Sequence, residues 1–400
     1  MADNKDKKVL NVPALRFPEF SGEWNTSSIE EQFELYSGNT PSRMDKKQFD
    51  GTVNWITSGE LKEHYIADTK EKISDEAVKS NNLKLLPVGT FVIAIYGLEA
   101  DGVRGTCSIT ASESTISQAC MAFISKKDIA NEFLYAWYKK HGNVIGIRYA
   151  QGTKQQNLSY DIIEKFNISY PCIEEQKKLI RFISLIDERI ATQNKIIEKL
   201  ETLIKGICNK SLYTVNGTAI QLGDILIERR ERTVINNQYE VLSSTVKGIF
   251  SQREYFSKDI ASENNVGYKI IRLHDVVLSP QNLWMGNVNY NDNFEVGIVS
   301  PSYKVFSIAE NLDKRYIATL LKTHRALYNY MLVSEQGASI VRRNLNMEAF
   351  EQITFKIPPL SKQEKIGNAI SILQARITSA IRIKTAYEAQ KQWLLTQMFI

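Results

Sequence analysis

The sequence repeats itself, and this duplication constrains the fold more than any other feature. When residues 157–213 are placed over residues 344–400 at a constant offset of 187, roughly a dozen positions are identical and most others agree in polarity. Identical positions of the first copy include Asn157-Leu158, Pro171, Gln176, Lys178, Ile183-Ser184 and Arg189-Ile190. A period this long exceeds that of a solenoid unit, so we expect a duplicated domain with an attached helix.

Upstream of these segments the two copies are less similar but keep the same order of elements. Strand-like apolar runs, closed by turn residues, are followed in each copy by an aromatic-rich helical pattern. The corresponding segments are 89–97 with 274–282, 116–125 with 299–308, and 131–140 with 314–324. Each copy therefore predicts a domain of mixed strands and helices.

The chain divides into four segments. They are an N-terminal segment with a first domain (1–172), a central helix (173–214), a second domain (215–359) and a C-terminal helix (360–400). Pro171 and Pro358-Pro359 precede the two helices, where proline ends one element before the next begins. We expect an α+β fold in which two mixed α/β domains are separated by two long antiparallel helices, related by a pseudo-twofold repeat.

Heptad spacing predicts that the two helices pair as a coiled coil. The first seam consists of Leu179, Ile183, Ile186, Ile190, Ile197, Leu200, Ile204 and Ile207. It is interrupted at Gln193, which either pins the register or is a tolerated imperfection. The second seam begins with Ile366, Ile370, Leu373 and Ile377, loosens at Ala380, Lys384, Tyr387 and Lys391, and recovers at Leu394 and Met398. Two ordinary bundle helices are the alternative. A helix of about 38 residues is about 57 Å long, the length of about 17 base pairs of a DNA duplex.

Composition and motifs argue against several classes of protein. The chain is 43% hydrophobic and 24% charged, which is typical of a folded protein and not of a disordered one. No apolar run reaches the length of a membrane helix. The N-terminus has no apolar signal region, and four scattered cysteines favour a reduced, cytoplasmic protein. No Gly-Lys dipeptide offers a phosphate-binding loop, and the four histidines form no zinc motif, so we expect neither a catalytic site nor a metal.

Several strings of the sequence resemble the specificity subunits of Type I restriction-modification systems. The opening 11–24 (NVPALRFPEFSGEW) is similar to their usual start, and 157–180 and 344–366 resemble their passages from domain to helix. The remaining similar strings are 38–43, 55–61, 85–97 and 116–123 in the first domain, and 241–250 and 297–306 in the second. The sequence departs from the family at Ser117-Gln118-Ala119, where Asn-Gln-Ala is usual.

The resemblance implies a non-catalytic subunit that reads a bipartite, asymmetric site in double-stranded DNA, one half with each target recognition domain. It further implies that the helices set the spacing and dock two methyltransferase subunits, which modify adenine N6 with S-adenosylmethionine. Nuclease-translocase subunits can join such a complex. No cofactor is implied in this chain, and no membrane partner.

Residues that read DNA must offer donors to base edges and cations to phosphates. Polar and glycine-rich loops beside the strands supply the candidates. In the first domain these are Trp55, Thr57, Ser58, Lys62, Tyr96, Gln151, Thr153, Lys154 and Gln155, the last four within the loop 151–156. In the second they are Thr245, Lys247, Arg253, Asn282, Trp284, Ser339, Arg342 and Arg343, the last three within the loop 336–343.

Plainer interpretations stand beside these assignments. Trp55 and Trp284 can instead pack in a core, and Ser58 and Lys62 can be ordinary solvated surface. The charge run 229–232 is typical of a solvated face and is left out of the candidate set. A net charge of +5 permits DNA binding without requiring it, so a coiled-coil adaptor that reads no DNA is the alternative function. A self-sufficient DNA-modifying enzyme is disfavoured by the missing motifs.

Overall fold

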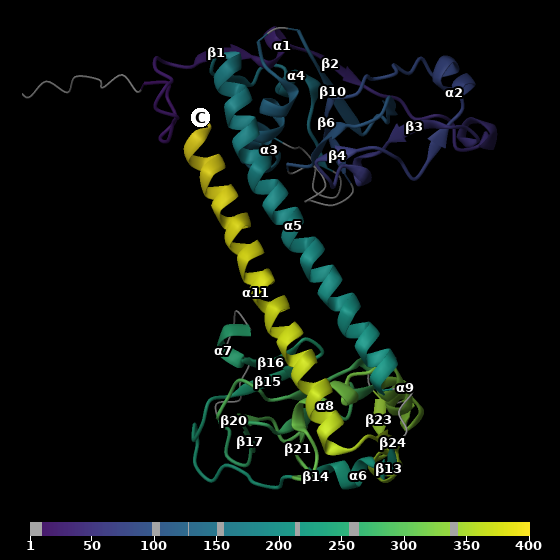
Figure 1. Ribbon diagram of the computed structural model, residues 1–400. Helices are drawn as coiled ribbons and strands as arrows, with labels where there is room; N and C mark the ends of the chain where they lie inside the picture. Colours follow the sequence, from purple (N-terminus) through teal and green to yellow (C-terminus); the bar gives the residue numbers. More distant parts are fainter. Residues whose placement is uncertain are drawn as a thin grey trace, which may run out of the picture. The chain divides into compact units, whose positions relative to one another are not determined.

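The structure, a computed structural model, describes residues 10–97, 105–126, 128–149, 156–212, 217–255, 264–336 and 343–400. The chain forms two compact units, the first comprising Met1–Thr192 with Ile383–Ile400 and the second Gln193–Arg382 (Figure 1). Each unit has its own buried core. Each also contains part of both long helices, α5 (Ile173–Leu212) and α11 (Leu360–Met398).

A five-stranded sheet forms the centre of the first unit. Its strands lie in the order β2 (Phe33–Ser37), β10 (Cys120–Ser125), β6 (Phe91–Ala94), β8 (Cys107–Thr110) and β4 (Tyr65–Ile66). Neighbouring strands are antiparallel except for β4 and β8. The predicted apolar run 89–97 contains the central, fully buried β6. Helix α3 (Asn131–Tyr149) packs on the sheet through Phe133 and Leu134, which share a core cluster with Phe91.

Smaller elements surround this sheet. The strands are β1 (Asn25–Ser28) paired with β12 (Asn167–Tyr170), β7 (Tyr96–Gly97) paired with β11 (Gln156–Asn157), and the sheet β5 (Lys72–Ile73), β3 (Val53–Ile56) and β9 (Ser114–Ile116). The short helices are α1 (Ile29–Gln32), η1 (Lys46–Phe49), η2 (Ser58–Glu60), α2 (Asp75–Ser80) and α4 (Tyr160–Ile163).

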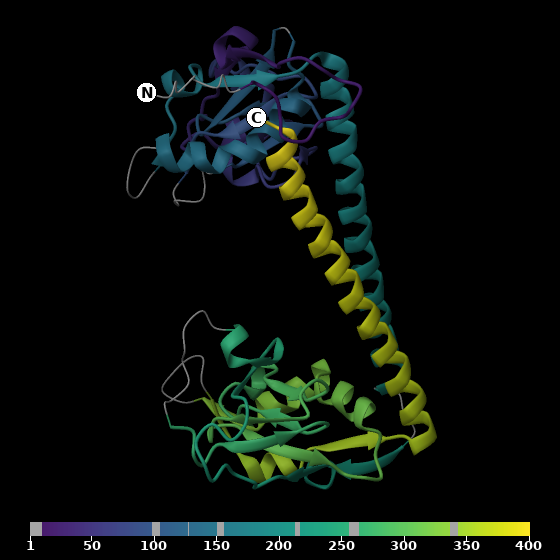
Figure 2. The same ribbon diagram turned by 90° about the vertical axis from the view of Figure 1, so that its left-hand side faces the viewer.

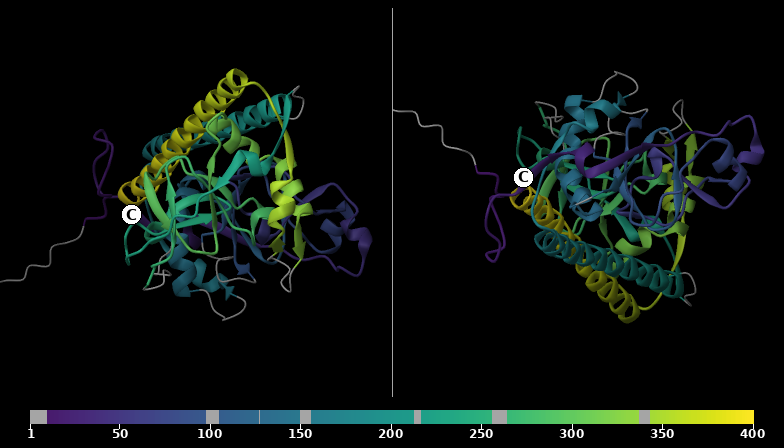
Figure 3. Two further views of the ribbon diagram at one scale, coloured as in Figure 1. Left: turned by 90° about the horizontal axis from the view of Figure 1, so that it is seen from below. Right: turned by 90° about the horizontal axis from the view of Figure 1, so that it is seen from above.

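Within the first unit, the beginning of α5 packs antiparallel against the end of α11 (Figures 2 and 3). Leu179 and Ile183 of α5 share a core cluster with Leu394 and Met398 of α11. One ion pair joins the same two segments, since Lys391 Nζ lies 2.7 and 2.8 Å from the two carboxylate oxygens of Asp187. The predicted antiparallel packing is therefore present in this unit.

The second unit is built on a four-stranded antiparallel sheet. Its order is β14 (Leu226–Glu228), β21 (Lys304–Ile308), β18 (Val276–Leu278) and β19 (Val288–Tyr290). The other strands pair as β13 (Thr218–Gln221) with β24 (Thr354–Ile357), β15 (Leu242–Thr245) with β16 (Gly248–Ser251), β17 (Lys269–Arg272) with β20 (Val296–Val299), and β22 (Ser334–Gln336) with β23 (Arg343–Leu345). The helices are α6 (Leu222–Ile225), α7 (Gln252–Tyr255), η3 (Leu283–Met285), α8 (Lys314–Leu321), α9 (His324–Leu332) and α10 (Met347–Glu351).

The helical pattern predicted over 314–324 is interrupted in the structure. Helix α8 ends at Leu321, and a new helix, α9, begins at His324. Thr323 causes the break, because its Oγ1 accepts a hydrogen bond from Ala326 N–H at 3.2 Å and so caps the new helix. The equivalent segment of the first unit continues as the single 19-residue helix α3.

The internal repeat is visible in the fold of the two units. Both sheets begin with the equivalent order β2-β10-β6-β8 and β14-β21-β18-β19. The 187-residue offset carries Asn167 of β12 onto Thr354 of β24, and Ile173 of α5 onto Leu360 of α11. The units differ most between β2 and β6 and in the equivalent stretch between β14 and β18. A shared framework therefore carries two different insertions.

The predicted seam positions of the long helices are less exposed than the other positions of these helices. From Leu179 to Ile207 every predicted seam position of α5 is buried or half-buried, including Gln193, whose two interpretations both stay open. In α11 the loosened positions are also buried or half-buried, namely Ala380, Lys384, Tyr387 and Lys391. Most other positions of both helices are exposed, as expected for paired helices.

Candidate nucleic-acid interface

The two loops predicted to contact DNA, 151–156 and 336–343, adjoin equivalent positions of the two units. In the first unit, Gln156 pairs with Gly97 between β11 and β7. In the second unit, Arg343, which is Gln156 shifted by 187, donates its N–H to Gln281 O at 3.1 Å. Six predicted contact residues of these loops lie outside the described residues: Gln151, Thr153, Lys154, Gln155, Ser339 and Arg342.

In the first unit, three short segments meet beside the predicted contact residues. Backbone hydrogen bonds run from Ser117 N–H to Ile56 O and from Ile95 N–H to Ala119 O, each at 2.9 Å. Thr57, at the end of β3, therefore lies close to the turn 117–119, which in turn adjoins half-buried Tyr96. The structure thus connects two of the predicted segments through a turn that was not in the candidate set.

The segment after β3 presents its polar residues from a capped turn. Glu60 accepts hydrogen bonds from Thr57 N–H at 2.9 Å and from Thr57 Oγ1 at 3.1 Å, which closes η2. Ser58 is half-buried in this turn, and Lys62 just beyond it is exposed. Lys62 makes no ion pair with a described residue, so its charge is available to a phosphate.

Trp55 is a correction to the candidate set. Its side chain is 2% exposed and packs with Ile73 and Leu83 in a small core of the three-stranded sheet. Its indole N–H donates to Asn39 O at 3.2 Å, so the polar edge is also occupied. No face of this ring is free for a base, and Trp55 belongs to the core.

Gln118 is an exposed residue that the sequence analysis did not select. It is exposed between buried Ser117 and half-buried Ala119. The Ser117 Oγ accepts a hydrogen bond from Ala119 N–H at 3.3 Å, which shapes the turn. Gln118 lies within the string 116–123 that resembles the family, between the atypical Ser117 and Ala119.

In the second unit, a two-residue turn presents two of the predicted residues. Thr245 ends β15, and its Oγ1 accepts a hydrogen bond from Lys247 N–H at 3.1 Å. Val246 and Lys247 are exposed at the tip of the hairpin. Gly248 begins β16 with φ of 139°, a conformation that side-chain-bearing residues rarely adopt. The tip therefore projects one cation from a tightly defined turn.

The hairpin tip lies beside three more predicted residues. A Cβ on Gly286, which follows η3, would meet Val246 Cγ1 at 3.9 Å. Trp284 lies in η3, and the Arg343 guanidinium lies 4.6 Å from the centre of its ring. Trp284 and Arg343 are half-buried, and no described residue forms an ion pair with Arg343.

Three polar atoms of these residues are buried without a hydrogen-bond partner among the described residues. They are Asn282 Oδ1, Trp284 Nε1 and Arg343 Nε. Unsatisfied buried polar groups are few in folded proteins and often mark functional positions. The structure therefore places Thr245, Lys247, Asn282, Trp284 and Arg343 in one region of the second unit, and their contact with DNA stays a prediction.

Arg253 is separate from this group. It is exposed on α7, which begins immediately after Ser251 at the far end of β16. Gln252 N–H donates to Val241 O, at the start of the hairpin. The four residues of β16 place it about 13 Å from the tip.

The arginines that were left out of the candidate set are engaged in the fold. Arg229 forms a bidentate pair with the 2% exposed side chain of Asp275, at 2.9 and 3.0 Å. This hydrogen bonding raises the pKa of the Arg229 guanidinium. Arg230 lies 3.6 Å from Glu228, and Arg232 donates to Gly267 O at 2.8 Å. These three guanidinium groups therefore already have carboxylate or carbonyl partners within the second unit.

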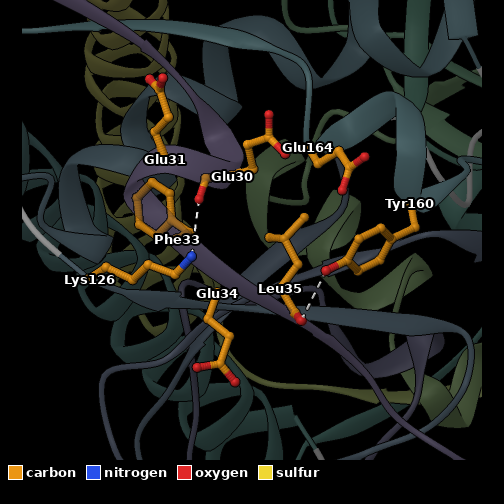
Figure 4. A pocket seen from close by; sticks show the side chains of 8 residues that line it. All are labelled: Glu30, Glu31, Phe33, Glu34, Leu35, Lys126, Tyr160 and Glu164. Carbon is orange, nitrogen blue, oxygen red and sulfur yellow. Dashed lines mark hydrogen bonds between the residues drawn. The ribbon is translucent and has the colours of Figure 1, made fainter.

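One hollow of the first unit has the wrong charge for DNA. A pocket of about 330 Å³ lies beside α1, β2 and α4 (Figure 4). It is lined by Glu30, Glu31, Phe33, Glu34, Leu35, Lys126, Tyr160 and Glu164. The Lys126 ammonium group donates to Glu30 O and does not neutralise these carboxylates directly. Phosphates would be repelled here, so this surface is not part of the candidate interface.

The described part of the chain contains no cluster of three or more His, Cys, Asp or Glu side chains suited to a metal ion. Among its helices, none combines the length and apolar character that crossing a membrane requires.

The sequence profile of the "Type I restriction modification DNA specificity domain" family matches residues 21–202 and again 220–386. The chain belongs to this family. Its two family domains correspond to the two copies seen in the sequence and in the sheets.

Two relatives with similar sequence are specificity subunits of Type I restriction enzymes. A 185-residue stretch, 44% of this chain, is 28% identical to 42% of the MjaIX Type I restriction enzyme specificity subunit of Methanocaldococcus jannaschii. A specificity subunit of a Type I restriction enzyme from Escherichia coli is 27% identical over 191 residues, 46% of each chain. The matched stretches thus span less than half the length of these relatives.

The fold is similar to that of a solved S subunit of a Type I restriction-modification system from M. genitalium. The TM-score is 0.61 at 14% identity, covering 97% of this chain and 99% of that chain. A structure from work on complex assembly and conformational transition of the type I R-M system gives a TM-score of 0.54 at 12% identity, over 94% of this chain and 97% of that chain.

Proposed function

We propose that this protein is the DNA sequence-recognition subunit of a Type I restriction-modification complex, in which each unit reads one half of a bipartite, asymmetric site in double-stranded DNA. One observation carries the proposal. The two copies of the family's DNA specificity domain are built on equivalent sheets, and each presents a cation that has no acidic partner among the described residues, Lys62 in the first and Lys247 and Arg343 in the second. Such groups supply the phosphate and base-edge contacts of sequence-reading proteins.

The two long helices are long enough to hold two half-sites apart. At 1.5 Å per residue, the 40 residues of α5 extend about 60 Å, which is between one and two turns of duplex. We assign to the helices the spacing of the two half-sites and the docking of two methyltransferase subunits. Those partners would methylate adenine N6 with S-adenosylmethionine, and nuclease-translocase subunits could join them. This chain would be non-catalytic, hold no cofactor and work in the cytoplasm.

A domain exchange tests the proposal. Residues 215–359 are replaced by the equivalent domain of another family member, and the chain is assembled with its methyltransferase subunits. Sequencing of the methylated DNA should show that one half-site changes while the other stays. The reciprocal exchange of residues 1–172 should change only the other half-site. A change in both halves, or in neither, would contradict the assignment of one half-site to each domain.

DNA binding of the assembled complex separates this function from a protein adaptor. Binding should be selective for sequence and should weaken with salt, because phosphate neutralisation releases counterions. An adaptor that reads no DNA would show neither property. Methyl transfer by the purified chain without partners would instead indicate an enzyme.

A further inference from the structure

A buried asparagine connects the central sheet of the second unit to the hairpin that carries Thr245 and Lys247. Asn289 lies on β19, is 2% exposed, and donates from Nδ2 to Ser244 Oγ and to Thr245 O, both at 2.7 Å. These acceptors are the last two residues of β15, immediately before the exposed turn. A single amide group therefore fixes the backbone from which the turn begins.

The orientation of this amide is set by a lysine on another element. Lys322 Nζ donates to Asn289 Oδ1 at 2.6 Å, so the amide NH₂ must face the hairpin. Lys322 is an exposed residue at the end of α8, and its ammonium group reaches the buried amide of Asn289. Burial of this ammonium group lowers its pKa.

Two further side chains fix the same segment. Asn287 Nδ2 donates to Ser244 O at 3.0 Å, and the Tyr303 hydroxyl donates to the same oxygen at 3.0 Å. Ser244 Oγ in turn donates to Asn287 Oδ1 at 2.8 Å. A fully satisfied network of this kind rigidifies what it contacts, because every alternative position leaves a buried polar group unpaired.

The first unit has a polar residue at the equivalent position. Asn289 pairs with Val277 of β18, and Ser108 pairs with Val92 of β6, the equivalent strand. Ser108 is fully buried, and its Oγ donates to Glu63 O at 2.6 Å. Glu63 directly follows Lys62, an exposed candidate contact residue of that unit. The same strand position thus holds the backbone beside a candidate contact residue in both repeats.

We propose that Asn289 and Ser108 are positioning residues, each setting the sequence preference of one half-site by fixing the backbone that presents Lys247 or Lys62 to DNA. This inference rests on the proposed function and deepens it. Neither side chain is exposed, so neither touches DNA, and each acts through the segment to which it is hydrogen-bonded. A displacement of about 1 Å in such a segment is enough to weaken geometric discrimination.

The test uses Asn289→Ala and Ser108→Ala in the full chain, assembled with methyltransferase subunits. Methylation rates are compared on DNA with single-base changes in each half-site. Asn289→Ala should reduce discrimination about tenfold in one half-site only, and Ser108→Ala should do so in the other half-site only. The domain exchange of residues 215–359 identifies which half-site belongs to which unit.

Asn291→Ala is the matched control. Asn291 is 1% exposed and lies two residues beyond Asn289, but it holds Arg272 O and Phe294 O at 2.9 and 2.7 Å, away from the hairpin. It should lower thermal stability as Asn289→Ala does, with unchanged base preference. Lys322→Met provides a milder variant at a surface side chain, and Lys322→Arg should restore the preference because it keeps a cationic donor.

The outcomes are distinct. If Asn289→Ala and Lys322→Met lower stability but leave both half-sites unchanged, the positioning inference is overturned while the proposed function stands. If both half-sites relax equally, the inference is also overturned, because the effect is then not confined to one unit. If the unaltered complex shows no sequence-selective methylation, the proposed function itself fails.

Discussion

Gln176 and Gln363 share two side-chain hydrogen bonds in the two repeats, and Gln176 Nε2 makes a further one to Asp128 O at 2.7 Å. Gln176 Nε2 donates to Pro171 O at 3.0 Å, and Gln363 Nε2 donates to Pro358 O at 2.9 Å. The Oε1 atoms accept from Ala130 N–H and Asp313 N–H, each at 3.0 Å. Both side chains are almost fully buried, at 0% and 2% exposed. Each glutamine thereby joins the start of a long helix to the segment that precedes the main helix of its domain.

Replacing either glutamine by alanine should destabilise its own unit. The change leaves a backbone N–H and a proline carbonyl without their partners, at an expected cost of about 1–3 kcal/mol in the free energy of unfolding. Hydrogen exchange should show faster opening in the first unit for Gln176→Ala and in the second for Gln363→Ala. Gln374→Ala, at an exposed position of α11, should have little effect. Equal opening of both units by either variant would contradict the equivalence.

Arg343→Ala should weaken DNA binding through the second unit. The guanidinium is held 4.6 Å from the Trp284 ring and has no acidic partner among the described residues. We expect the salt dependence of binding to fall by about one counterion if Arg343 contacts a phosphate, or a loss of preference at one base if it contacts a base edge. Arg343→Lys should rescue binding only in part, since lysine lacks the planar group that stacks on Trp284.

The comparison variant for this prediction is Arg230→Ala. Arg230 is 88% exposed and lies 3.6 Å from Glu228, within the charge run left out of the candidate set. A titration of the assembled complex on its DNA at several salt concentrations should separate the two variants. Equal losses for both would show that general positive charge, and not the Arg343 site, governs binding.

Arg16→Ala should cost far more than an ordinary surface ion pair. Arg16 forms two hydrogen bonds, of 2.8 and 2.7 Å, with Glu175, whose side chain is 1% exposed. Removing the arginine leaves a buried carboxylate unpaired, for which about 3–5 kcal/mol is expected. Arg181→Ala breaks the exposed pair with Glu188 on the same helix and should cost about 0–1 kcal/mol. Chemical denaturation measures both, and the double variant Arg16→Ala, Glu175→Gln should recover much of the loss.

Glu132 should make the first unit sensitive to acid. Partial burial alone would raise the pKa of this carboxyl group, but hydrogen bonds from His64 at 3.0 Å and Tyr65 at 2.8 Å hold the pKa below its usual value of 4.5. A depressed folded-state pKa stabilises the protein above the unfolded-state value, and this contribution is lost as the pH falls through the folded-state pKa. The stability advantage of the native protein over Glu132→Gln should therefore be constant well above pH 4.5 and shrink as the pH falls below that value and through the folded-state pKa.

Thermal unfolding across this pH range is the measurement. Glu198→Gln, at an exposed position of α5, should leave the pH profile unchanged. A constant difference between the native protein and Glu132→Gln at every pH would show that Glu132 contributes only through packing.

The local sequence around a tryptophan did not decide whether its side chain is fully buried. Trp55 and Trp284 both follow polar, strand-like stretches, and the sequence treats them alike. Trp55 is buried because a second small cluster around Ile73 and Leu83 covers it, whereas Trp284 is half-buried beneath Arg343. The residues that decide this lie tens of positions away, where local periodicity carries no information.

By itself the sequence determined the duplication, the mixed strand-and-helix domains, the two long helices and the inward face of each helix. These features follow from local patterns, namely a constant offset, strand and helix periodicity, and proline before each helix. Only the tertiary structure decided that Asn289, Lys322 and the hairpin form one network, and that Arg343 lies over Trp284. Such contacts join segments distant in sequence, and they exist only after the sheet has brought those segments together.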